Sequence, residues 1–315
     1  MSFFVPAAPP SEDFRKIVEA EPGAFALLGD LAAGRAVLAG DTQVADQRVP
    51  AGSWVKLFQA YALVAGGQVS TGEQVRCDGW QGPGLRCWYG PGHGELDLSG
   101  ALAHSCNAWF AVMRPRLEKA GYEAALAALL PEAADRPADP SGAAAWDGAY
   151  LRGELTAHSP RFDALCRAVA ALVLGRRPEW AGTGESRALG GSPMTLDETA
   201  RAAVLAGMRR AASEGTAVEL AREFGSDDLL AKTSSMMPAA APARSRNRNR
   251  CCMVCVFYPA EAPRAFAFLF VPRGFAPEKA APLAGRVLRS FCLQRNILNS
   301  TAKAQRTQSN LNAER

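Results

Sequence analysis

Strand-forming segments lie near the two ends of this sequence, with a long helical stretch between them, and this layout constrains the fold more than any other feature. Two apolar segments at residues 24–30 and 35–40, joined through Gly34, predict a β-hairpin. Three more strand-like segments follow late in the chain, at residues 228–234, 252–258 and 265–271. Because an isolated hairpin is only marginally stable, we expect the early and late strands to pair in one antiparallel sheet.

The residues between these strands have helical patterns separated by loops. A helix is expected at residues 53–66, closed by two glycines, and another from about 97 to 119. Residues 161–175 are helical in pattern, and Thr195-x-x-Glu198 is a capping box that should open the next helix. Loops are expected at residues 67–95, 131–150 and 178–194.

Together these elements predict an α+β fold, an α/β sandwich in which a five-stranded antiparallel sheet is flanked by helices and holds an inserted all-helical lobe. Short helices are expected at residues 11–20 and 278–292. The chain has 315 residues, 48% of them hydrophobic, which is enough for a sizeable core. We expect an N-terminal extension (1–22), one domain (23–292) with the lobe at about 67–225, and a disordered polar tail (293–315).

Charge and hydropathy restrict the kinds of partner. The net charge of +4 and the 21% of charged residues do not point to a nucleic-acid partner, which should show a concentrated basic face. No apolar run approaches the roughly 18–20 residues that cross a bilayer, so no transmembrane segment is expected. The first residues show neither a basic region nor a long apolar region, so no signal peptide is visible, and the sequence as written predicts a cytoplasmic product.

A serine and a lysine stand one helical turn apart at the start of the helix expected at 53–66. Ser53-x-x-Lys56 places both side chains on the same helix face. A serine hydroxyl attacks well only after a base takes its proton, and a lysine acts as that base only if its pKa is lowered. This motif alone also fits a serine helix cap beside a solvated lysine.

Two further motifs follow in order, Ser105-Cys106-Asn107 and Lys232-Thr233-Ser234. The three motifs together resemble the active-site set of penicillin-binding proteins and serine β-lactamases. The segments VPAGSWVKLF, LRCWYGPGHGELDLSGALAHSCNAWF and GGSPMTLDETARAAVLAGM are similar to the corresponding segments of elongation-type penicillin-binding proteins. The resemblance covers roughly residues 24–292 and implies a β-lactamase/transpeptidase-like fold.

The resemblance implies a D,D-transpeptidase that acts on the D-Ala-D-Ala stem peptide of peptidoglycan. Ser53 would form an acyl-enzyme that an amine resolves, and β-lactams would acylate the same serine. The family acts outside the cytoplasm, in the periplasm or its equivalent, together with other proteins of cell-wall synthesis. No cofactor is expected for catalysis.

The resemblance also implies a role for each motif residue. Lys56 would be the base, Ser105 would relay the proton to the leaving amine, and Asn107 would hold the substrate amide. Lys232 would add positive potential, and the Thr233 hydroxyl would bind the substrate carboxylate. The backbone N–H groups of Ser53 and Ser235 would form the oxyanion hole.

One residue departs from the family pattern, because Ser234 stands where the third motif has glycine. A side chain there is expected to crowd the strand edge along which substrate lies. Two alternatives therefore stay open: a degenerate, non-catalytic scaffold, and a hydrolase of the D,D-carboxypeptidase or β-lactamase type. The deacylating E-x-x-L-N motif of class A β-lactamases is not evident in the sequence.

Four potential metal ligands lie in one short stretch: Cys77, Cys87, His93 and Cys106. Three thiolates and an imidazole suit tetrahedral zinc, and a closed set of four ligands is typical of a structural site. The family resemblance supports this reading, since some elongation-type members look to have a metal site formed by this loop and the middle residue of the second motif. A Cys77–Cys87 disulfide and free thiols are the alternatives.

A second cysteine pair, Cys252-x-x-Cys255, lies within a strand-like segment. Positions three apart in a strand face opposite sides of the sheet. We therefore expect these two thiols to be ordinary core residues.

Overall fold

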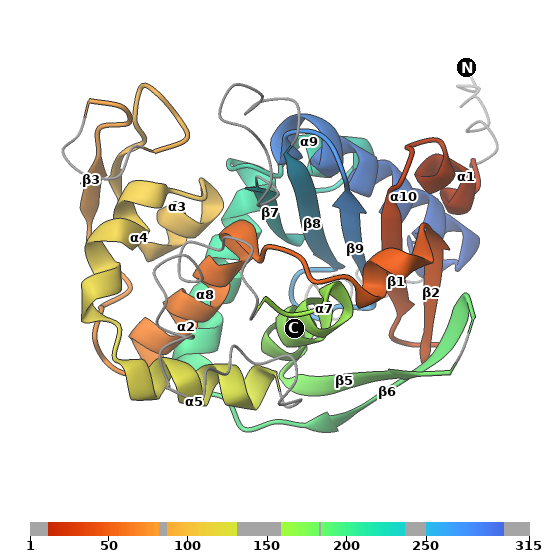
Figure 1. Ribbon diagram of the computed structural model, residues 1–315, viewed down its shortest axis with the longest axis horizontal. Coiled ribbons are helices and arrows are strands. Elements are labelled where there is room, and N and C mark those ends of the chain that lie inside the picture. Colours follow the sequence, from red (N-terminus) through yellow and green to blue (C-terminus); the bar gives the residue numbers. More distant parts are fainter. Residues whose placement is uncertain (1–11, 82–86, 131–158, 183, 237–249, 299–315) are drawn as a thin grey trace, which may run out of the picture.

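The computed structural model describes residues 12–81, 87–130, 159–182, 184–236 and 250–298, and its main element is an antiparallel sheet (Figure 1). Within these residues the sheet has seven strands in the order β5-β6-β2-β1-β9-β8-β7. The strands are β1 (Phe25–Asp30), β2 (Arg35–Gly40), β5 (Arg176–Ala181), β6 (Ser186–Pro193), β7 (Leu230–Met236), β8 (Cys251–Tyr258) and β9 (Ala265–Val271).

The early and late strands join as the sequence predicts. Strand β1 pairs with β2 on one side and with β9 on the other, so that Leu27 lies opposite both Leu38 and Phe268. Gly34 has a φ of 61°, a conformation that glycine adopts without penalty, and it closes the β1–β2 turn. Strand β7, which contains the third motif, forms one edge of the sheet.

The predicted strand number is wrong, because the expected loop at 178–194 forms the hairpin β5–β6 and extends the sheet beyond β2. The segment SRALGGSP has weak strand propensity, and tertiary contacts decide its conformation. The Trp180 side chain of β5 is buried against Phe266, and its indole N–H donates to the Asp163 carboxylate.

Helices cover both faces of the sheet (Figure 1). The described helices, some of which form the lobe, are α1 (Phe14–Glu19), α2 (Val55–Ala65), α3 (Leu98–Ala103), α4 (Asn107–Met113), α5 (Lys119–Leu129), α7 (Phe162–Leu174), α8 (Glu198–Ser213), α9 (Val218–Phe224) and α10 (Ala281–Gln294). The loop expected at 131–150 lies outside the described residues. One core lies between the sheet and α1, α9 and α10. The larger core lies between the other face and α2 and α7, and it continues into the lobe.

Two cysteines of β8 show that this strand is buried on both faces of the sheet. Cys252 belongs to the core under α10, whereas Cys255 belongs to the core beside α7. The two thiols therefore face opposite sides of the sheet, and each is an ordinary packing residue as predicted.

The single helix expected from 97 to 119 is wrong. Helix α3 ends at Ala103, and Ser105 then adopts a left-handed φ of 52° before α4 begins at Asn107. A non-glycine residue in this region is strained by about 1–3 kcal/mol and persists only where its surroundings fix it. The break turns Ser105 toward two lysines described below.

Several predicted boundaries also need correction. The N-cap of α8 is Asp197, whose carboxylate accepts from the Ala200 N–H at 2.8 Å, so the Thr195 capping box does not form. The last helix begins only at Ala281, after a π-helical turn (Ala276–Ala280), and the buried Ile297 lies within the expected disordered tail. The expected loop at 67–95 contains two short paired strands, β3 (Val75–Cys77) and β4 (Gly94–Leu96).

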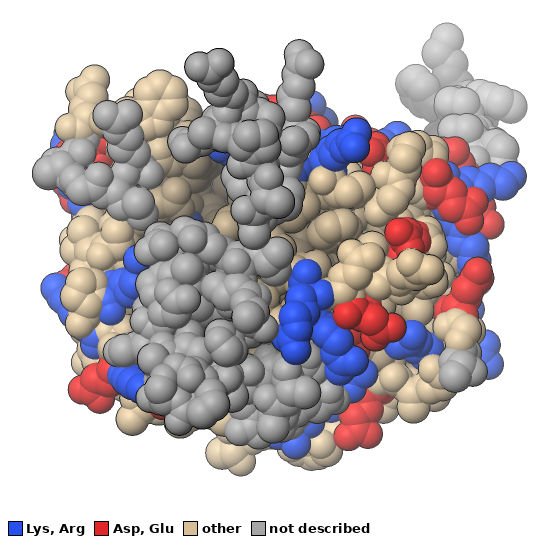
Figure 2. All heavy atoms as spheres, viewed as in Figure 1, with Lys and Arg blue, Asp and Glu red and all other residues tan. Residues whose placement is uncertain are grey.

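Two further features are the surface charge and the length of the helices. Figure 2 shows Lys and Arg interspersed with Asp and Glu over the described part of one face. Among the described helices, none is both long and apolar enough to cross a bilayer.

Candidate active site and metal cluster

The first motif lies at the junction of the lobe and the sheet. Ser53 belongs to a 3₁₀ turn (Gly52–Trp54) that leads directly into α2. The Trp54 side chain is fully buried, and its indole N–H donates to the Lys232 carbonyl of β7 at 3.1 Å. This contact fixes the first motif against the strand that contains the third.

Lys56 lies one turn further along and points at the second motif. Its Nζ donates to the Ser105 carbonyl at 2.7 Å and to Asn107 Oδ1 at 2.7 Å, with the Ser105 hydroxyl at 3.4 Å. The left-handed conformation of Ser105 presents both its carbonyl and its hydroxyl to this one side chain. The sequence places these residues about fifty positions apart, and only the fold brings them together.

A second lysine reaches the same serine from the sheet. Lys232 Nζ donates to the Ser105 hydroxyl at 2.9 Å and to the Thr233 carbonyl at 2.9 Å. The Ser105 hydroxyl therefore lies between two buried amines from opposite sides of the site.

Burial changes the titration of both amines. Burial lowers the pKa of Lys56 from 10.5 to about 8. Burial also lowers the pKa of Lys232 well below its ordinary value, and the nearby positive charge of Lys56 lowers it further. A lysine in this state exists partly as the neutral amine, the form that can accept a proton near neutral pH.

The Thr233 hydroxyl is held by Thr216, a residue that was not predicted from the sequence. Thr233 Oγ1 donates to Thr216 Oγ1 at 2.6 Å, and the Thr216 hydroxyl and N–H both donate to the Ala103 carbonyl, at 3.3 and 3.1 Å. Thr216 lies in the short turn between α8 and α9, next to Gly215. No local pattern distinguishes this turn from other helix connections, so no signal in the sequence points to it.

The two serines that follow have different partners. The Ser234 hydroxyl accepts from the Ser53 N–H at 2.9 Å. The Ser235 hydroxyl accepts from the Ala276 N–H at 2.7 Å, which ties β7 to the π-helical turn before α10. Within the described part of the chain, no hydrogen bond joins the Ser53 hydroxyl to Lys56, and such contacts are often loose before substrate binds.

The fold thus gathers every motif residue predicted from the sequence around one point at the edge of β7. These residues are Ser53, Lys56, Ser105, Asn107, Lys232, Thr233, Ser234 and Ser235. They come from the 3₁₀ turn and the start of α2, from the α3–α4 break and the start of α4, and from the edge strand. The arrangement therefore depends on the whole domain.

Comparison with known proteins agrees with this geometry. Residues 30–130 match the penicillin binding protein transpeptidase domain family. The transpeptidase domain of penicillin-binding protein 3 from Burkholderia pseudomallei has a similar structure, with a TM-score of 0.67 and 14% sequence identity over 90% of this chain and 95% of that one. The chain has the fold of a penicillin-binding protein transpeptidase domain.

Other structures with this transpeptidase fold are similarly distant in sequence. Pseudomonas aeruginosa PBP2 in complex with WCK 5153 gives a TM-score of 0.67 and 16% identity, covering 89% of this chain and 73% of that one. A ceftriaxone acyl-enzyme of penicillin-binding protein A from M. tuberculosis gives 0.66 and 14%, covering 88% and 76%.

The chain spans only part of some of these proteins. It covers 56% of a chain from a peptidoglycan synthase complex, which matches with a TM-score of 0.68 and 19% identity over 86% of this chain. No curated protein sequence matches it.

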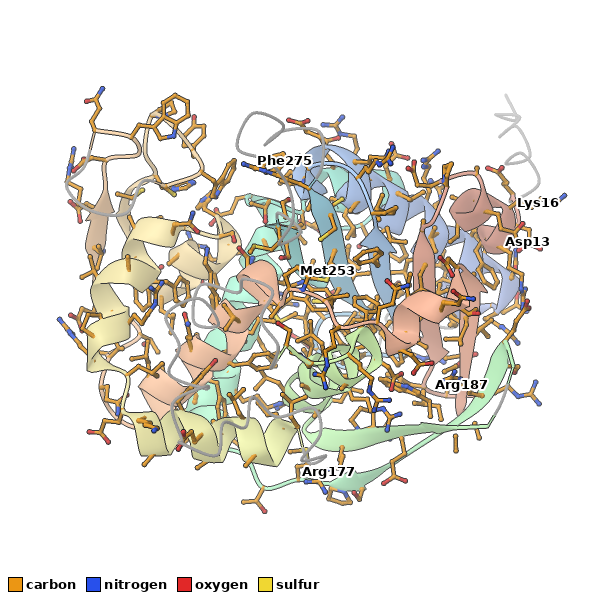
Figure 3. The ribbon with its side chains drawn as sticks, in the orientation of Figure 1. Asp13, Lys16, Arg177, Arg187, Met253 and Phe275 are labelled. Atoms are coloured by element: carbon orange, nitrogen blue, oxygen red, sulfur yellow. The ribbon has the colours of Figure 1, made fainter. Side chains whose placement is uncertain are left out.

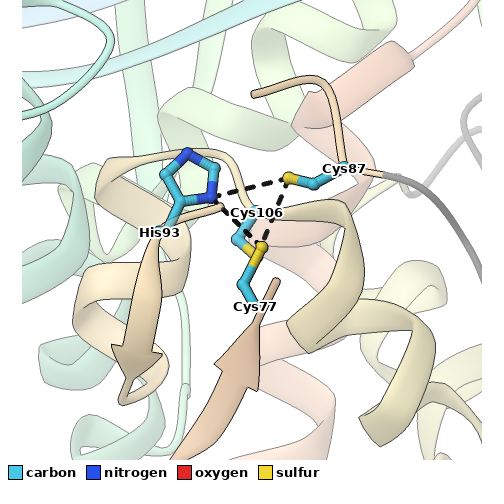
Figure 4. A group of neighbouring side chains, drawn as sticks. All are labelled: Cys77, Cys87, His93 and Cys106. Atoms are coloured by element: carbon cyan, nitrogen blue, oxygen red, sulfur yellow. Dashed lines mark hydrogen bonds between the residues drawn. The ribbon is translucent and has the colours of Figure 1, made fainter. Parts of the chain in front are cut away.

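Beside the three motifs lies a compact group of thiols and one imidazole (Figure 4). The ligand atoms of Cys77, Cys87, His93 and Cys106 all lie within 4.8 Å of one another. His93 Nδ1 is 3.5 Å from both the Cys77 and Cys87 sulfurs, and the Cys87 and Cys106 sulfurs are 4.0 Å apart. Tetrahedral zinc with ordinary bond lengths needs about 3.6 Å between sulfur and nitrogen and about 3.8 Å between sulfurs.

The chemistry of this donor set also fits a metal. The contact with Cys106 holds the pKa of the Cys87 thiol far below its ordinary value, while the same contact and burial raise the pKa of Cys106. A divalent metal would take the place of the proton that these sulfurs share. The eight cysteines are all free and buried, so no Cys77–Cys87 disulfide is present.

Glycines allow the loop that holds these ligands to fold tightly. A β-carbon at Gly92, where φ is 87°, would overlap the Cys77 carbonyl, and one at Gly79 would overlap the Gly90 carbonyl. Cys106 is also the N-cap of α4, and its sulfur accepts from the Trp109 N–H. The cluster therefore joins the loop directly to the helix that begins with Asn107.

The same loop reaches across to the sheet. Trp88 donates its indole N–H to the His104 carbonyl at 2.9 Å, and its ring packs 5.8 Å from that of Phe275. Phe275 lies just before the π-helical turn, near the end of the sheet strands (Figure 3). The loop thus contacts both the segment before the second motif and the segment before the π-helical turn.

Proposed function

We propose that this protein is a penicillin-binding serine acyltransferase of the D,D-transpeptidase type, acting on the D-Ala-D-Ala stem peptide of peptidoglycan. The observation that supports this most is the pair of buried lysines, Lys56 and Lys232, that converge on the Ser105 hydroxyl. Lys56 lies one helical turn after Ser53. A solvated lysine beside a helix cap would show neither the burial nor the convergence.

In the acylation step, neutral Lys56 accepts the proton of the Ser53 hydroxyl. Ser53 Oγ forms a bond to the carbonyl carbon of the penultimate D-Ala, and the amide C–N bond to the terminal D-Ala breaks. The proton passes from Lys56 through the Ser105 hydroxyl to the leaving amine. The N–H groups of Ser53 and Ser235 stabilise the oxyanion of the tetrahedral intermediate.

The remaining residues position the substrate. Asn107 holds the substrate amide while its Oδ1 accepts from Lys56. The Thr233 hydroxyl turns away from Thr216, to which it donates in this structure, and donates to the terminal carboxylate instead. An incoming amine then attacks the acyl-enzyme and releases Ser53 by the reverse proton path.

We propose a structural zinc ion bound by Cys77, Cys87, His93 and Cys106. A closed set of three thiolates and one imidazole provides folding stability and leaves no open position for substrate. The ion would hold the loop against α4 and so keep Ser105 and Asn107 in place.

The proposed substrate lies outside the cytoplasm, so we propose that the protein acts there, alongside other proteins of cell-wall synthesis. One protein of the same fold, Helicobacter pylori PBP2, has been solved in complex with MreC. That similarity, at 16% identity, supports a protein of cell-wall synthesis as a partner but does not identify which one.

Labelling with a fluorescent penicillin tests the proposal. The wild-type protein should form a covalent adduct that survives denaturation, and Ser53→Ala should abolish it. Ser290→Ala is a matched control, because Ser290 is a buried serine of α10 on the opposite side of the sheet. Labelling that persists in Ser53→Ala would remove Ser53 as the nucleophile.

A non-catalytic scaffold is the second candidate, and one observation favours it: the Ser234 hydroxyl already accepts from the Ser53 N–H that the oxyanion needs. The lifetime of the adduct separates the candidates. A stable adduct supports a penicillin-binding transpeptidase, rapid turnover supports a hydrolase, and no adduct supports a scaffold.

A further inference from the structure

The backbone N–H of Ser53 already has a partner inside the protein. It donates to the Ser234 hydroxyl at 2.9 Å, and Ser234 is only 2% exposed. This N–H is one of the two that the proposed mechanism uses to stabilise the oxyanion. When the substrate carbonyl binds, the Ser53 N–H is therefore already hydrogen-bonded to Ser234.

The local structure is built around this contact. Gly52 has a φ of 54°, and a β-carbon added there would overlap the Ser234 hydroxyl and lie 2.5 Å from Met236 Cγ. The Ser234 side chain thus fills the space beside the backbone that Gly52 leaves open. Its rotamer is set by packing as well as by the hydrogen bond.

We propose that Ser234 is an internal occupant of the oxyanion hole and limits the rate of acylation at Ser53. This inference rests on the proposed function. A backbone N–H has one hydrogen, so it cannot fully bond both the Ser234 hydroxyl and a carbonyl oxygen. Each acyl donor must therefore displace the Ser234 hydroxyl before the transition state forms.

The size of the effect follows from the one hydrogen bond that is lost. The net contribution of such a bond corresponds to about a two- to twelvefold change in rate. Ser234→Ala removes the hydroxyl and keeps the β-carbon, so acylation should accelerate by that factor. Ser234→Gly also clears the strand edge and should accelerate acylation at least as much.

The first test is the second-order rate constant for acylation by a fluorescent penicillin. We expect Ser234→Ala and Ser234→Gly to exceed the wild type by the stated factor, and Ser290→Ala to equal it. Acceleration in Ser234→Gly alone would assign the effect to the β-carbon and overturn the role of the hydroxyl. An unchanged or slower rate in both variants would overturn the inference while leaving Ser53 as the nucleophile.

The second test does not depend on activity. In protein labelled selectively with ¹⁵N-serine, the Ser53 amide signal is identified by its loss in Ser53→Ala. We expect Ser234→Ala to shift this signal and to speed its exchange with solvent, because the N–H loses its acceptor. An unmoved signal overturns the inference. A moved signal with no penicillin adduct in any variant supports Ser234 as the partner of the Ser53 N–H and refutes the proposed acyltransferase, and with it the limit on acylation.

Discussion

The pH dependence of acylation follows from the burial of Lys56. Its pKa is lowered from 10.5 to about 8, so the neutral amine makes up about one tenth of the molecules at pH 7, against about one in 3,000 for an ordinary lysine. The burial therefore supplies roughly 300-fold more of the reactive base. The rate should rise about tenfold per pH unit up to about pH 8 and then level off.

The assay is the acylation rate with a fluorescent penicillin between pH 6 and pH 10, because the penicillin carboxylate stays ionised throughout this range. Lys56→Met should lack the reaction altogether. The variant should be at least as stable as the wild type, since burying the charged Lys56 amine costs roughly 3 kcal/mol of folding free energy. A rate that is flat from pH 6 to pH 10, or that still rises at pH 10, would refute Lys56 as the base.

Two further predictions concern the metal cluster and the carboxylate site. Removing zinc with a strong chelator should lower both the melting temperature and penicillin labelling. Cys106→Ser should reproduce both losses, and Cys252→Ser should reproduce neither. Elemental analysis that finds no zinc in folded, penicillin-reactive protein would contradict the proposed metal site. Thr216→Val should strengthen noncovalent binding of a penicillin by about two- to twelvefold, because the Thr233 hydroxyl no longer has to leave an acceptor inside the protein before it donates to the carboxylate. Titration of Ser53→Ala with penicillin, compared with and without Thr216→Val, measures that change, and equal affinities would contradict the role of Thr216.

Much of the sheet could be predicted because its strands are continuous apolar runs between turn residues. Segments 252–258 and 265–271 are buried on both faces, and such runs are recognisable without knowledge of their partners. The hairpin β5–β6 could not be predicted in this way, since its glycines and its two prolines are typical of a loop. Its conformation depends on pairing with β2 and on the contact between Trp180 and Asp163.

The same distinction between local patterns and long-range contacts applies to the candidate site. The motifs Ser53-x-x-Lys56, Ser105-x-Asn107 and Lys232-Thr233 resemble, in this order, those of penicillin-binding proteins, and that resemblance predicts which residues the fold brings together. Three features could not be predicted: the left-handed φ of Ser105, the hydrogen bond from Thr233 to Thr216, and the hydrogen bond from the Ser53 N–H to Ser234. Each of these depends on a contact between residues far apart in the sequence, and local propensity contains no information about it.

Formation of an acyl-enzyme at Ser53 can be tested by peptide mass spectrometry. After incubation with benzylpenicillin, trypsin should release the peptide of residues 49–56, VPAGSWVK, which contains Ser53 as its only hydroxyl residue. We predict that this peptide gains the mass of one penicillin and that the gain is absent from Ser53→Ala. An unmodified 49–56 peptide in folded wild-type protein, or an adduct found on another peptide, would contradict the assignment of Ser53 as the nucleophile.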